Sequence, residues 1–173
     1  MLESNVLRYH RDYSLRDLTT AESLVLISYR LWLLHHVQAP DPGLPDWRTG
    51  LAAVGLSRAA DELFDPLAEA TVTGSRLSVE IQPLRCRRIS HQEGFLLGCH
   101  AQLQHHLLED AGRTLSDWLS PTAGRVASPL LWRFAMALST AQLILPLRYA
   151  SRSAARRGAV KSPLWHGGVS RLH

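Results

Sequence analysis

The residues with the most versatile chemistry in this chain are its two cysteines, Cys86 and Cys99, and the histidines near them. Thiolate and imidazole groups bind zinc and other transition metals. His106 follows Cys99 by seven residues, so a helix would place both side chains on one face, with Cys86 just before that helix. A site built from Cys86, Cys99 and His106 would make the protein a metal or redox sensor.

The spacing of these residues argues against such a site. It matches neither the paired ligands of a zinc finger nor the His-Glu-x-x-His motif of a metalloprotease. Cys99 lies at helical spacing from Leu96 and Leu103, so we expect it to be a small buried side chain. We therefore expect the protein to hold no metal and no other cofactor.

Motifs of covalent and phosphoryl-transfer catalysis are absent from the sequence. There is no Gly-x-Ser-x-Gly elbow, and no Gly-rich loop stands where it would cradle a phosphate. Adjacent carboxylates, such as those of Glu109 and Asp110, fall at the ends of predicted helices, where solvation explains them. We expect that the protein is not an enzyme.

The basic residues are concentrated at the C-terminus. The formal charge is +4, but residues 148–173 carry six basic residues and no acid, which leaves −2 for residues 1–147. A helix would align the first three of these arginines, spaced four apart, in a stripe suited to phosphates, anionic lipids or an acidic protein face. The candidates for contact with a partner are Arg148, Arg152, Arg156, Arg157 and Lys161.

The order of the predicted helices also suggests a way to bind nucleic acid. The predicted order of elements over residues 19–82 is helix, helix, helix and hairpin, which is the order of a winged helix-turn-helix domain. Its recognition helix would be residues 58–70, whose exposed side chains include Asp61, Glu62 and Glu69. Phosphates repel carboxylates, so we expect any binding to nucleic acid to come from the basic tail of a winged-helix-like body.

The elements that would position these residues begin with the stretch from Thr19 to His36, the most apolar of the chain. Thr19 and Glu22 form a capping box at its start. Asp46 caps a short helix over residues 47–54, after a proline-rich loop. Ser57 caps the next helix, which we expect to break or kink at Pro66.

The spacing of the apolar residues changes from helical to alternating at residue 71. Apolar and polar residues alternate over residues 71–82, which predicts a short β-hairpin. Ser90 and Glu93 form a second capping box, opening a helix that we expect to run to about Glu109. Residues 114–119 predict one more short helix, and the Ser-Pro pair at 128–129 predicts the start of the last helix, residues 129–145.

Together these patterns predict a mostly α-helical protein: a single-domain orthogonal bundle with one short β-hairpin at about residues 71–82. We expect an N-terminal arm over residues 1–18, the helical domain over 19–147, and a flexible basic tail over 148–173. The longest apolar stretch without charge, residues 134–147, is shorter than the ~20 residues of a membrane span.

By elimination, the sequence favours a small adaptor or regulatory protein that acts through protein–protein contacts. Two cysteines and a polar N-terminus without a signal peptide favour the cytoplasm. A single lysine against many arginines suggests the coding bias of a GC-rich bacterium. The alternatives are a nucleic-acid-associated protein that uses the tail, and a metal or redox sensor that uses Cys86 and Cys99.

Overall fold

The computed structural model describes residues 9, 13–37, 42–56 and 58–148, and this part of the chain folds into six α-helices without a sheet. A 3-10 helix, η1 (Leu15–Asp17), precedes them. The helices are α1 (Thr20–Val37), α2 (Trp47–Ala53), α3 (Arg58–Thr73), α4 (His91–Gln104), α5 (Leu108–Trp118) and α6 (Pro121–Thr140). The prediction of a mostly helical protein is confirmed.

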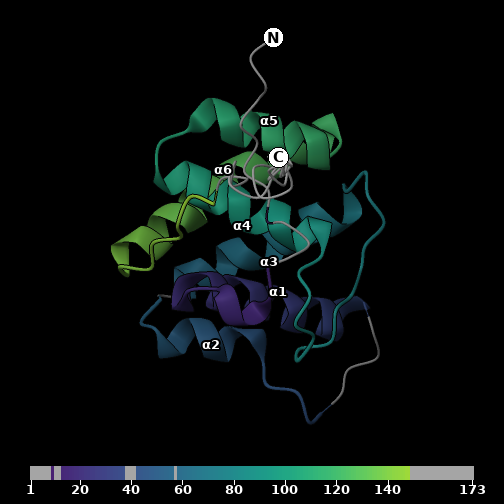
Figure 1. Ribbon diagram of the computed structural model, residues 1–173, viewed down its shortest axis with the longest axis vertical. Helices are drawn as coiled ribbons and strands as arrows, with labels where there is room; N and C mark the ends of the chain where they lie inside the picture. The colour runs from purple at the N-terminus through teal and green to yellow at the C-terminus, as the bar shows by residue number, and fades with distance from the viewer. Residues whose placement is uncertain (1–8, 10–12, 38–41, 57, 149–173) are drawn as a thin grey trace, which may run out of the picture.

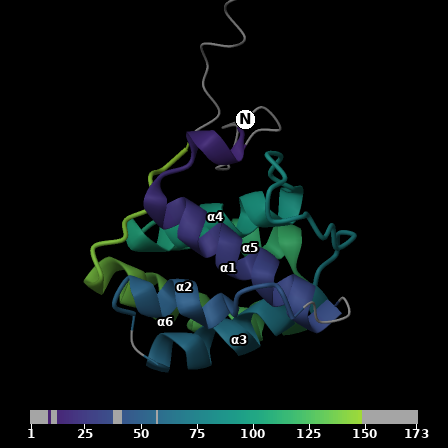
Figure 2. The ribbon, with the colours of Figure 1, turned by 90° about the horizontal axis from the view of Figure 1, so that it is seen from below.

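The helices pack in layers along the long axis of the molecule. Figure 1 shows α5 at one end and α2 at the other, with α3 and α4 between them. The closest partnerships are α3 with α6, α4 with α5 and α6, and α1 with α2. Seen from below, α1 crosses in front of α4, with α2, α3 and α6 on one side of it (Figure 2).

The starts of α1, α2 and α4 are specified by the capping residues that the sequence marks. The backbone N–H of Thr19 donates to Glu22 Oε2 at 2.7 Å, and the N–H of Glu22 donates to Thr19 Oγ1 at 3.3 Å. Ser90 and Glu93 form the second capping box. Asp46 caps α2 through a bond from the N–H of Arg48. These pairs satisfy backbone donors that the first turn leaves free.

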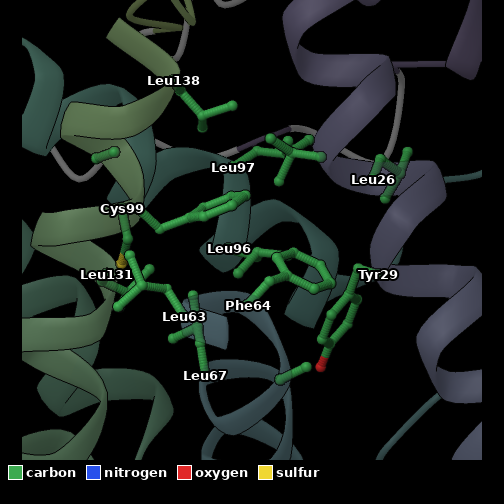
Figure 3. Packing of buried hydrophobic residues seen from close by; sticks show 14 of the residues in the cluster. Leu26, Tyr29, Leu63, Phe64, Leu67, Leu96, Leu97, Cys99, Leu131 and Leu138 are labelled. Carbon is green, nitrogen blue, oxygen red and sulfur yellow. The ribbon is translucent and has the colours of Figure 1, made fainter. Parts of the chain in front are cut away.

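The core lies where α1, α3, α4 and α6 meet (Figure 3). Phe64 of α3 is central, because its ring centroid lies 5.2 Å from that of Phe134 in α6 and 5.2 Å from that of Trp47 in α2. Fully buried aliphatic side chains surround these rings: Leu26, Leu67, Leu96, Leu97, Leu131 and Leu138. The contact of three rings from three helices fixes how α2, α3 and α6 sit together.

The predicted β-hairpin at residues 71–82 is wrong: the described chain has no strand there. α3 continues to Thr73, because Thr71 faces the core, where its hydroxyl lies 3.2 Å from the Tyr29 hydroxyl. Residues 78–83 have no ladder partner. Isolated bridges join Ser75 to Leu119 and Ser14 to Arg88, so this segment follows other elements instead of pairing with itself.

A buried ion pair holds the loop between α3 and α4. The Arg30 guanidinium donates from Nε to Glu93 Oε1 at 2.6 Å and from Nη2 to Oε2 at 3.0 Å. Its remaining N–H groups donate to the carbonyls of Pro83, Cys86 and Arg88. Both charged side chains are almost completely buried. Because every guanidinium donor has an acceptor, the loop closes around Arg30 without a strand.

The bounds of three predicted helices are also wrong, and the helix predicted over residues 114–119 is α5, which begins at Leu108 and ends at Trp118. The helix expected to reach Glu109 ends at Gln104, where His106 takes a left-handed conformation (φ 60°) and a new helix, α5, follows. α6 begins at Pro121 instead of Pro129 and ends at Thr140. α3 also continues through Pro66, so the predicted break there is wrong. Each interior proline removes one backbone donor, and side chains buried on both sides of it compensate.

The described helices include none that combines the length and the apolar character of a membrane span.

Candidate functional site

A groove with a volume of about 550 Å³ runs between α5 and α6. The two helices follow each other in the chain and are joined at Leu119–Ser120. Gly112 and Ser116 line it from α5, while Gly124 and Ser128 line it from α6. These small side chains leave the helix backbones accessible along both walls.

The groove is closed at one end by the segment that follows α3. The N–H of Arg76 donates to the carbonyl of Trp118 at 2.9 Å, and the N–H of Ser120 donates to the carbonyl of Gly74 at 2.8 Å. A Cβ on Gly74 would lie 1.9 Å from that of Ala123, so the close approach requires glycine there. This contact brings Arg76 to the junction of α5 and α6.

The floor of the groove is apolar and fixed. Leu115 and Leu119 line it and are buried, with 5% and 1% of their surface exposed. Pro121 and Pro129 add exposed rings along the α6 wall. Since Pro129 has no N–H, the carbonyl of Arg125 lacks the helical donor that another residue would supply. The groove therefore offers an apolar base beside a backbone acceptor.

The charge of the groove is positive. Arg76 and Arg125 are the charged residues of its lining in the described chain, and both are exposed. Arg76 Nη1 donates to the carbonyl of Ser116 at 3.1 Å, and Arg125 Nη2 donates to Thr122 Oγ1 at 3.4 Å. Neither guanidinium has an acidic partner within the described residues, so both keep free donors.

Two glycines of the groove have open space where a side chain would stand. A Cβ on Gly112 or on Gly124 would meet no atom within 4 Å, although both glycines lie inside helices. Other glycines differ: Gly55 has a φ of +77°, a Cβ on Gly94 would lie 3.1 Å from that of Tyr9, and a Cβ on Gly50 in α2 would make an ordinary contact with Leu24 at 3.5 Å. Glycine inside a helix costs about 0.5–1 kcal/mol relative to alanine. The sequence thus bears this cost at two positions that open the same groove.

The three residues considered as metal ligands, Cys86, Cys99 and His106, lie in different environments. Cys99 is fully buried in α4, and burial raises the pKa of its thiol. Cys86 is half-buried in the loop around Arg30, and His106 is exposed after α4, its ring 6.4 Å from that of Trp132. Within the described chain, no three His, Cys, Asp or Glu side chains are grouped to hold a metal ion.

Among the basic tail residues, Arg148 lies in the described chain, and it is bound to the body of the protein. Its guanidinium donates from Nε to Glu22 Oε1 at 2.6 Å and from Nη2 to Oε2 at 2.7 Å, and it also donates to the carbonyl of Asp17. Its guanidinium carbon lies 4.9 Å from the ring centroid of Tyr13. Arg152, Arg156, Arg157 and Lys161 lie outside the described residues.

The partner of Arg148, Glu22, is fully buried at the start of α1. Burial alone would raise the pKa of this carboxyl, but hydrogen bonds from Arg148, Tyr9 and the N–H of Thr19 outweigh it and lower the pKa. The Tyr9 hydroxyl donates to Glu22 Oε1 at 2.6 Å. The capping carboxylate of α1 therefore joins residues that precede α1 and follow α6 in the chain.

One buried titratable group lies apart from both regions. His100 in α4 is fully buried, and its Nδ1–H donates to the carbonyl of Leu96 at 2.7 Å, while Nε2 has no partner in the described structure. Its ring meets Phe134 edge-on. Burial lowers the pKa of His100 to about 4, so the ring is neutral near pH 7.

The groove was not predicted from the sequence, because one predicted helix ended at about Glu109, the next began at residue 114, and Arg76 was placed in a hairpin. The signals that could have found it are the Ser120–Pro121 start of α6, which the sequence marks, and Gly124 four residues after it. With α5 placed before that start, Gly112 lies eight residues before Ser120 and Gly124 four residues after it, on the two walls of the groove.

The chain matches no protein-family model, no curated protein and no solved structure. Its function therefore has to be inferred from its own residues.

Proposed function

We propose that this protein is a small adaptor or regulator that acts through protein–protein contacts, and that the groove between α5 and α6 is its contact surface. The observation that carries the proposal is the pair Gly112 and Gly124, which open the groove at a cost in helix stability. Glycine on both walls lets the backbone of another chain approach closely.

The lining supports binding instead of covalent chemistry. Its polar groups are serine hydroxyls and two arginines, and no acid or histidine in the lining stands beside a serine as a base. The exposed rings of Pro121 and Pro129, above the buried floor of Leu115 and Leu119, would contact an apolar side chain of a partner, and the rim would supply hydrogen bonds. We place this adaptor in the bacterial cytoplasm, where thiols such as Cys86 and Cys99 stay reduced.

Site-specific photocrosslinking in the protein's own cells tests this function. A photoreactive phenylalanine at position 128, inside the groove, should give a discrete adduct with one protein. The matched control places the same residue at position 58, whose arginine side chain is 91% exposed on α3. Adducts of equal yield from both positions, or none from position 128, would contradict a contact surface in the groove.

The second candidate function rests on the charge of the tail. Five basic residues follow Arg148, and a segment of this kind binds phosphates with a strong dependence on salt. A chain ending at Arg148 tests it: loss of nucleic-acid binding at low salt, with the groove adduct retained, would assign separate roles to tail and groove.

A further inference from the structure

We propose that the partner segment that docks between α5 and α6 is acidic and amphipathic, with carboxylates that pair with Arg76 and Arg125 and apolar side chains that pack against the exposed rings of Pro121 and Pro129 above the buried floor. This inference rests on the proposed function and names the chemistry of the partner. It follows from the charge, the shape and the length of the groove.

The positive charge of the groove favours an acidic partner segment. Arg76 and Arg125 are both exposed and have no acidic partner in the described chain, and the lining of the groove contains no carboxylate. The first turn of α6 contains no acid either, so the positive end of its dipole adds to the two guanidinium groups. Paired surface arginines bind carboxylates through charge-assisted hydrogen bonds. An acidic segment therefore complements every charged element of the groove.

The same charge argues against the C-terminal tail of this chain as the occupant. Residues 149–173 carry five basic residues and no acid, so they would meet Arg76 and Arg125 with like charge. Like charges in contact cost binding energy and suppress the wrong partner. A separate protein with acidic side chains fits better than the tail.

The dimensions fit a short helix. From Gly112 to the junction at Ser120 and from Ser120 to Ser128, each wall spans eight residues, or about 12 Å at 1.5 Å per residue. This is the length of about two helical turns. Gly112 and Gly124 leave room for a helix backbone between the walls, as small residues do where helices approach closely.

Two synthetic peptides test the inference. The probes are a 15-residue helical peptide of alanine, leucine and glutamate with one apolar face, and its counterpart with every glutamate replaced by lysine. Fluorescence anisotropy of the labelled peptides with the full chain should show that the glutamate peptide binds at least about tenfold more tightly than the lysine peptide. Binding of the glutamate peptide should weaken with added salt.

Variants locate the binding. Arg76→Gln with Arg125→Gln should weaken binding of the glutamate peptide about tenfold, whereas Arg58→Gln, a matched exposed arginine on α3, should leave it unchanged. Gly112→Leu with Gly124→Leu should abolish it while the far-UV circular dichroism stays helical, because both positions are open.

Each other outcome overturns the inference in a distinct way. Equal binding of both peptides, or binding of neither, contradicts an acidic partner, while the crosslinking result decides the adaptor function separately. Tighter binding of the lysine peptide would assign a basic partner. Growth of the sedimentation coefficient with protein concentration, lost in Gly112→Leu with Gly124→Leu, would show that a second copy of this chain occupies the groove and would overturn a separate partner.

Discussion

Replacing Gly112 and Gly124 by alanine should stabilise the protein. Each glycine lies inside a helix, and a Cβ at either position would meet no atom within 4 Å. Alanine in a helix is favoured over glycine by about 0.5–1 kcal/mol, so the double variant should gain about 1–2 kcal/mol in free energy of unfolding. For a chain of this size, that gain raises the midpoint of thermal unfolding by about 2–8 °C.

Thermal and urea unfolding followed by circular dichroism at 222 nm measure this change. The matched control is Gly74→Ala, which should destabilise by about 1–3 kcal/mol because its Cβ would lie 1.9 Å from that of Ala123. The stabilised Gly112→Ala, Gly124→Ala protein should also lose most of the adduct from position 128. If alanine at both positions lowers the stability, the fold itself needs these glycines and the argument for the groove fails.

Three further predictions concern the body of the protein. Arg30→Met should lower the free energy of unfolding, measured with urea, by about 3–5 kcal/mol because it leaves the carboxylate of Glu93 buried without its partner. An equal loss in Arg58→Met, which removes an exposed arginine, would contradict this prediction. Arg148→Ala should lower the free energy of unfolding by about 1.5–3 kcal/mol, because it removes the hydrogen-bond partner of the fully buried Glu22 carboxylate. A chain that ends at Arg148 should unfold like the full chain, and an equal loss of stability in both proteins would refute the pairing. Folding lowers the pKa of His100 from an ordinary 6.5 to about 4, so the unfolded state takes up a proton first as the pH falls. The free energy of unfolding should therefore drop by about 2 kcal/mol between pH 7 and pH 5. This drop should disappear in His100→Phe, and an unchanged pH dependence in that variant would rule out His100 as its source.

The starts of α1, α2 and α4 could be predicted from the sequence because they depend on local chemistry. Thr19 with Glu22 and Ser90 with Glu93 form the expected capping boxes, and Asp46 caps α2. Cys99 was predicted to be buried, and it is. These residues contact partners within a few positions of the chain, so spacing alone reveals them.

The errors arose where distant contacts decide the structure. The alternation over residues 71–82 predicted strands, but Tyr29 holds Thr71 in a helix, and Arg30 binds the carbonyls of the loop that follows. The contact of Arg148 with Glu22 joins residues 126 positions apart, so local spacing could not reveal it. The groove depends on the contact of Gly74 and Arg76 with the junction of α5 and α6, which no local pattern indicates.

The most direct test of the central proposal is chemical-shift mapping of the ¹⁵N-labelled protein with the partner recovered by crosslinking from position 128. A contact surface between α5 and α6 predicts the largest changes at the backbone amides of Gly112, Ser116, Gly124 and Arg125, and little change in α2. Changes centred on α1 and α2, or confined to residues after Arg148, would contradict it.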